Sequence, residues 1–244
     1  MVRKTKISET DATAPQDPRS RIVEALMALA ATQDFSEITI ADIAAKAEVS
    51  LADFREAFPS KGAVLAGFAR QMDLAVLRGT GEDMADESAK DRLFDVLMRR
   101  LDAMAPYKAA LDTILHWVRR DPLAATALNG VALNSMRFML EAANLSSEGP
   151  AGGLKLQGLV LAWSRVMAVW LREEDSGMPK TMSALDKELV RGATLVARAE
   201  DFARLTAPLR NICESLFTAR RGLRDGMRRR ERWEPGETAE ARPR

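Results

Sequence analysis

The chain has 244 residues, of which 47% are hydrophobic and 29% charged, and its formal net charge is +1. This length and apolar content suit one large or two small folded domains with a buried core. A single cysteine and a single histidine exclude an intramolecular disulfide framework, a cysteine-ligated zinc site and a multi-histidine metal centre.

Residues 1–17 form a polar arm with balanced charge, which we expect to be disordered. From residue 19 onward the apolar residues recur at spacings of three and four, the pattern of one buried helix face. Two short helices are predicted next, because Thr39 with Asp42 and Ser50 with Asp53 both match the capping box that starts a helix. Ser60 opens a further helix that runs through residue 72.

A polar segment at residues 79–89 marks a predicted domain boundary. Longer apolar-periodic segments beyond it predict helices over residues 92–104, 107–118, 122–143, 154–172 and 181–205. The composition also favours helix, since Ala and Leu far outnumber Val and Ile. We therefore predict an all-α fold, with a three-helix helix-turn-helix domain over residues 18–78 and a larger helical ligand-binding and dimerisation domain over residues 89–217.

The tail over residues 218–244 is basic. Seven arginines and two acidic residues lie between residues 220 and 232, an excess of five positive charges. Such a run suits a solvated helix end, a phosphate-binding tail or an anchor on a membrane surface, and composition does not distinguish them. No apolar run reaches the length of a membrane span and the N-terminus is not a secretory signal, so we expect a cytoplasmic protein.

Two short capped helices joined by a tight turn, with a longer helix before them, match a helix-turn-helix. In such a motif the second helix turns its outer face, here Leu51, Asp53 and Arg55, toward the major groove of DNA. Three core-packing helices of any all-α protein would give the same periodicity. The spacing alone therefore leaves both interpretations open.

Residues 19–65 resemble the N-terminal DNA-binding domain of the TetR/AcrR family of transcriptional regulators. The matching segments, which need no gaps, are residues 21–26, Phe35, residues 38–44, residues 47–50 and residues 58–65. The resemblance implies a homodimer that binds double-stranded operator DNA and is controlled by a small hydrophobic effector, acting as a repressor. It also implies that the helix over residues 154–172 and the next one can form a four-helix dimer interface, so Trp163 and Trp170 suit either that interface or the core.

Three residues depart from this family pattern. Arg55 and Ala57 stand where the family usually has aromatic or histidine side chains, and Glu48 stands in place of the turn glycine. Five basic and seven acidic residues between residues 18 and 65 give this segment a net charge of −2. DNA binding draws much of its affinity from the neutralisation of phosphates by basic residues. A segment with a net negative charge must therefore bind DNA through a few well-placed contacts.

The candidate DNA contacts are Thr39, Ser50, Leu51, Asp53, Arg55 and Lys61. Ligand pockets are mostly apolar with a few polar groups, and methionine adapts to varied ligands. The candidate ligand contacts are accordingly Met104, Tyr107, His116, Trp117, Met136 and Met139. Core packing is the alternative interpretation of these side chains, and it is the commoner role for a residue of each type. No metal ligands, no cofactor and no catalytic residues are predicted, because any nucleophile–base device would depend on His116.

A second interpretation is a lipid-binding protein of the same fold without a regulatory role. The accessory proteins of ubiquinone biosynthesis resemble this chain at residues 117–123, at Trp170-Leu171 and at residues 184–186. Such proteins also touch membranes through a terminal amphipathic helix, a role that the arginine-rich tail would suit. Sequence-selective DNA binding would support the regulator, and a co-purified lipid without DNA binding would support the lipid-binding protein.

Overall fold

The computed structural model describes residues 17–79, 87–148 and 152–197. The predicted arm up to residue 16, most of the boundary at 79–89, the end of the last predicted helix, Cys213 and the arginine-rich tail lie outside these ranges. The described residues form helices and no strand, which confirms the all-α prediction. None of these helices combines the length and the apolarity that a membrane span requires.

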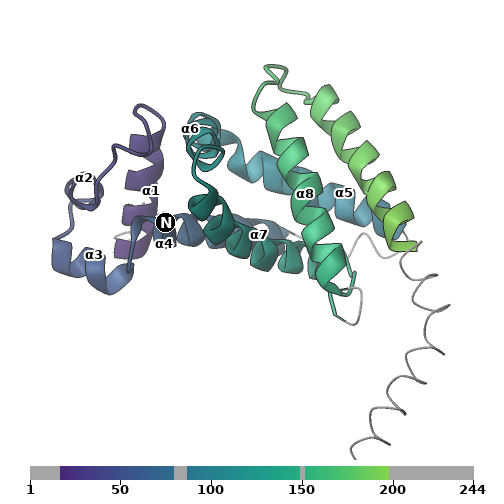
Figure 1. Cartoon of the computed structure of the whole chain (residues 1–244), viewed down its shortest axis with the longest axis horizontal. Coiled ribbons are helices and arrows are strands. Elements are labelled where there is room, and N and C mark those ends of the chain that lie inside the picture. Colours follow the sequence, from purple (N-terminus) through teal and green to yellow (C-terminus); the bar gives the residue numbers. More distant parts are fainter. Residues whose placement is uncertain (1–16, 80–86, 149–151, 198–244) are drawn as a thin grey trace, which may run out of the picture. The chain divides into compact units, whose positions relative to one another are not determined.

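The N-terminal helices are α1 (Pro18–Ala30), α2 (Ile40–Lys46), α3 (Leu51–Ala57) and α4 (Lys61–Gly79). They are followed along the chain by α5 (Ala89–Met104), the short 3₁₀ helix η2 (Ala105–Tyr107), α6 (Lys108–Val118), α7 (Pro122–Ala142) and α8 (Gly152–Trp170). A last helix covers residues 179–197, beside α8 (Figure 1). The described helices up to Thr194 belong to one compact unit.

The helix starts follow from short-range capping. Thr39 and Ser50 each accept the backbone N–H three residues on, and the Asp at that position accepts the N–H of the cap, so both predicted capping boxes are confirmed. Asp121 caps α7 through the N–H groups of Leu123 and Ala124. Three starts differ from prediction: Ser88 caps α5 at residue 89 rather than 92, α8 begins at Gly152 rather than 154, and the last helix begins at Pro179 rather than 181.

The core of the N-terminal helices is continuous with the rest of the unit. Ile22 and Leu26 of α1 are fully buried, and Phe54 and Phe58 from the end of α3 pack into the same cluster. At Gly67 of α4 a Cβ atom would lie 2.9 Å from the Phe58 ring, so only glycine permits this approach. Because α4 also packs against α5 and α7, and α1 against α6, the motif is braced by the later helices.

Candidate nucleic-acid interface

The turn between α2 and α3 depends on Glu48. Its φ angle is 54°, the left-handed conformation that favours glycine. The Val49 N–H donates to the Ala44 carbonyl at 3.0 Å, which closes the turn, and the Arg21 guanidinium donates to the Glu48 carbonyl at 3.4 Å. The chain therefore keeps a left-handed turn between α2 and α3 although the residue there is not glycine.

Three of the predicted DNA contacts are engaged in the capping boxes. The Thr39 hydroxyl donates to the Asp42 carboxylate at 2.6 Å, and the Ser50 hydroxyl donates to the Asp53 carboxylate at 2.7 Å. The hydroxyl and backbone N–H of Ser50 together lower the pKa of Asp53, which keeps this carboxylate ionised. Since each hydroxyl proton is already committed to a carboxylate, these side chains set helix geometry and have no proton to offer a phosphate.

Two other predicted contacts lie open on the outer side of α3. Leu51 is 59% exposed at the first turn, and Arg55 is exposed at the last turn. One guanidinium nitrogen of Arg55 donates weakly to the Pro59 carbonyl at 3.4 Å. The remaining N–H groups of Arg55 are available to a ligand, as a bidentate contact to guanine or phosphate requires.

Lys61 has a different position. Its ammonium donates to the Phe35 carbonyl at 2.7 Å and to the Ile38 carbonyl at 2.8 Å, and it lies 4.4 Å from the centre of the Phe35 ring. Burial lowers the pKa of this half-buried lysine, against the opposing charge of Asp34. The side chain thus ties α4 to the loop after α1, and two of its three protons are used there.

Sequence reasoning missed the arginines of α1. The exposed Arg19 lies with its guanidinium carbon 4.5 Å from the centre of the Phe58 ring. Phe58 and Pro59 follow α3 directly, so Arg19 and Arg55 approach the same segment from two helices. Residue spacing within one helix gives no signal for this pairing, because the two arginines are far apart in sequence.

The predicted ligand contacts lie in different surroundings. Met104, Met136 and Met139 are buried in the core. The Tyr107 hydroxyl donates to the Glu24 carboxylate at 2.7 Å, and the Trp117 ring lies 4.6 Å from the Phe35 ring. His116 is exposed on α6.

Tyr107 and Trp117 therefore join α6 and its preceding turn to the N-terminal helices. Trp163 and Trp170, which suited either an interface or the core, are both buried within the core of the chain.

A buried charged cluster was also missed. Arg100 of α5 forms an ion pair with Asp73 of α4, and the Ser135 hydroxyl of α7 donates to the same carboxylate at 2.6 Å. All three side chains are buried, and the Arg100 guanidinium lies over the Trp163 ring. Helical periodicity marks such positions as apolar core, so only the fold reveals the pair. No group of three potential metal ligands occurs within the described ranges.

No protein-family model and no curated protein matches the sequence. Solved structures do match. The TetR transcriptional regulator from Nitrosomonas europaea is 23% identical, with a TM-score of 0.56 over 72% of this chain and 99% of that chain. A TetR transcriptional regulator from Rhodococcus sp. RHA1 is 22% identical, with a TM-score of 0.55 over 72% of this chain and 95% of that chain. The chain therefore has the fold of TetR transcriptional regulators.

Proposed function

We propose that the protein is a TetR-like DNA-binding transcriptional regulator, a repressor that acts as a homodimer under the control of a small ligand. The observation that carries this proposal is the capped helix-turn-helix of α2 and α3 within the fold of TetR regulators. Its second helix leaves Leu51 and Arg55 exposed, which suits insertion into a major groove.

The charge distribution favours an interface with few DNA contacts. With a net charge of −2 over residues 18–65, the segment lacks a broad basic surface. We assign two arginines to the phosphate backbone or a guanine edge: Arg19, which lies over the Phe58 ring, and Arg55, which donates to the Pro59 carbonyl. Leu51 offers an apolar contact of the kind that thymine methyl groups accept. Thr39, Ser50, Asp53 and Lys61 we assign to shaping and holding the motif.

Replacement of Arg55 tests these assignments. We expect Arg55→Ala to weaken operator binding by about 1–3 kcal/mol, because one good side-chain contact to a base is worth that much. Arg137→Ala, which removes an exposed arginine of α7, is the matched control and should bind the operator like the wild type. Equal binding by all three proteins in a fluorescence anisotropy titration would remove Arg55 from the interface.

A homodimer is supported by apolar side chains on adjacent helices. Leu161 of α8 is 50% exposed and Val190 of the next helix is 48% exposed. Two copies that pair through this face would place two α3 helices on one DNA molecule, as a two-fold symmetric operator requires. Sedimentation of the wild type as a dimer and of Leu161→Asp as a monomer is the expected result.

Ligand control requires that the effector bind the DNA-competent and DNA-incompetent arrangements with different affinity. The contacts between Tyr107 and Glu24 and between Trp117 and Phe35 join the two groups of helices that such an equilibrium would move. We call these four residues the joint, and we propose that ligand binding changes the position of α1 through their contacts.

The second candidate is a lipid-binding protein without DNA-binding activity. The observation that favours it is the net charge of −2 over residues 18–65, together with the resemblance at residues 117–123, 170–171 and 184–186. Under this interpretation the purified protein carries an isoprenoid or acyl lipid, detectable by mass spectrometry of an organic extract, and shifts no DNA. Membrane contact would then fall to the tail outside the described residues.

A further inference from the structure

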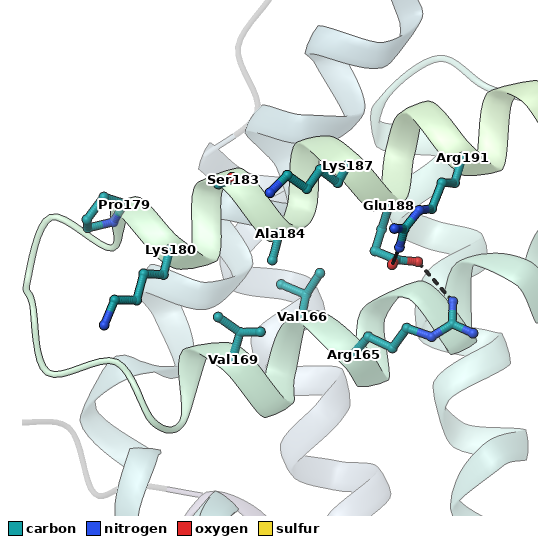
Figure 2. A pocket seen from close by; sticks show the side chains of 10 residues that line it. All are labelled: Arg165, Val166, Val169, Pro179, Lys180, Ser183, Ala184, Lys187, Glu188 and Arg191. Carbon is teal, nitrogen blue, oxygen red and sulfur yellow. Dashed lines mark hydrogen bonds and ion pairs between the residues drawn. The ribbon is translucent and has the colours of Figure 1, made fainter.

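A glutamate in the loop after α8 fixes the start of the last helix. Glu173 is 4% exposed, and its carboxylate accepts the backbone N–H groups of Lys180 and Thr181, each at 2.8 Å. It also accepts the Thr181 hydroxyl at 2.6 Å. Figure 2 shows this loop, which begins beyond Val169 and turns back to Pro179. From seven or eight residues away, Glu173 thus supplies the cap that the first N–H groups of this helix need.

The last helix is also held against α8 along its length. The Glu188 carboxylate accepts from Arg165 of α8 at 2.9 Å, a contact that bridges the two helices in Figure 2. Leu185 and Leu189 of the last helix are buried in the core to which α8 contributes Val166. Because the Glu173 cap and these contacts fix the last helix to α8, the two helices that carry the proposed dimer face form one element.

Lys108, the first residue of α6, reaches the loop between these two helices. Its ammonium donates to the backbone carbonyl of Glu173 and lies 5.2 Å from the centre of the Trp170 ring. Trp170 is the last residue of α8 and is 1% exposed. A hydrogen bond from a charged donor is stronger than one between neutral groups, and the face of an aromatic ring attracts the same cation. One side chain of α6 therefore holds both the end of α8 and the loop that caps the last helix.

The residue before Lys108 holds the N-terminal helices. Tyr107 donates to Glu24 of α1 at 2.7 Å, and its ring meets the Phe68 ring of α4 edge-on, with 5.0 Å between the ring centres. Consecutive Cα atoms are about 3.8 Å apart, and η2 leads directly into α6, so Tyr107 and Lys108 are displaced together. The Lys108 contact thus connects the joint to the two helices of the proposed dimer face.

We propose that Lys108 is a positioning residue that couples α8 and the last helix to α1, because it holds the Glu173 carbonyl while the adjacent Tyr107 holds Glu24. A change at the dimer face then reaches the DNA-binding helices through two consecutive residues. The consequence for operator binding rests on the function proposed above, whereas the coupling between the helices does not. The competing interpretation is that Lys108 stabilises the whole fold without favouring any one helix.

Hydrogen exchange of the full chain without DNA, followed by mass spectrometry of peptides, tests the coupling. Lys108→Met should speed exchange of the α1 amides roughly 10-fold, since one hydrogen bond from a charged donor is worth about that factor in local opening. The amides of α7 are the internal reference, and their exchange should stay unchanged. Lys108→Arg keeps a cationic donor and should exchange like the wild type.

Lys90→Met is the matched control. Lys90 also reaches the last helix, where it donates to Asp186 at 2.7 Å, but it belongs to the start of α5 and is not adjacent to Tyr107. This variant should leave exchange in α1 unchanged. For an operator selected from random DNA, the dissociation constant should rise about 5-fold in Lys108→Met and stay unchanged in Lys90→Met, since coupling between sites is typically worth at least that factor.

Three results would overturn the proposal. Unchanged exchange in α1 of Lys108→Met would show that the two groups of helices are not coupled there. Equal acceleration in α1 and α7 would make Lys108 a general stabiliser of the fold. Acceleration in α1 that Lys90→Met reproduces would show that any loosening of the last helix reaches α1. Because exchange is measured without DNA, a chain that shows the selective effect and binds no operator supports the coupling and contradicts only the function proposed above.

Discussion

At the scale of single residues, Glu48 shows how the motif tolerates a departure from its family pattern. A non-glycine residue in the left-handed conformation costs about 1–2 kcal/mol relative to a right-handed one. The Glu48 side chain is exposed and its carbonyl accepts from Arg21, so neighbouring contacts hold the turn.

We therefore expect Glu48→Gly to raise the free energy of unfolding by about 0.5–1 kcal/mol, since relief of the strained φ outweighs the entropy of the unfolded glycine. Chemical denaturation measures the difference. Glu48→Gln, which removes the charge and keeps the strain, is the control and should stay close to the wild type. A glycine variant less stable than the glutamine variant would show that the turn is unstrained.

Tyr107 supplies a second residue-scale prediction. Burial, with the hydrogen bond and charge of Glu24 added, raises the pKa of Tyr107 from 10.0 to about 12. The protonated hydroxyl therefore stabilises the fold at pH below 10, and this contribution is lost as the pH rises from 10 to 12. Tyr107→Phe has no hydroxyl and therefore lacks this contribution at every pH. The difference in the free energy of unfolding between wild type and variant should thus shrink from pH 10 to 12, as measured by denaturant unfolding at each pH. A difference that stays constant would mean that Glu24 does not hold the phenol.

At the scale of elements, the buried cluster of Asp73, Arg100 and Ser135 joins α4, α5 and α7. Arg100→Met should lower the free energy of unfolding by about 3–5 kcal/mol, because it leaves a buried carboxylate without its cation. Arg100→Met combined with Asp73→Leu should recover most of that loss, since an apolar pair of similar volume carries no desolvation penalty.

The exposed pair of Lys90 and Asp186 is the control for this cycle. Its nitrogen–oxygen distance is 2.7 Å, but both partners are in contact with water, so Lys90→Ala should change the stability little. If the double variant were as unstable as Arg100→Met alone, packing rather than the unpaired charge would explain the loss.

The elements also show what the sequence can predict. The starts of α2, α3 and α7 were predicted because a cap is a contact between residues two or three apart. The positions of Lys61, Tyr107 and Arg100 were not, because their partners lie 23 or more residues away. An apolar periodicity identifies a buried face but says nothing of which helix covers it.

At the scale of the molecule, the groups that carry the proposed activity lie on different helices. The DNA contacts that we propose come from α1 and α3, and the joint that we propose between the helices comes from α1, the loop after it, the turn before α6, and α6. The all-α class and the helix-turn-helix were predictable from periodicity and capping. The joint was not, because Tyr107 and Glu24 lie 83 residues apart and only the fold brings them together.

Selection from a random pool of double-stranded DNA by the purified full chain tests DNA recognition most directly. We predict enrichment of one two-fold symmetric sequence whose half-sites are separated by a whole number of helical turns, with an affinity that falls as salt rises. Arg55→Ala should weaken binding to that sequence. Recovery of no common sequence, together with equally weak binding to all DNA, would contradict the assignment of this fold to DNA recognition.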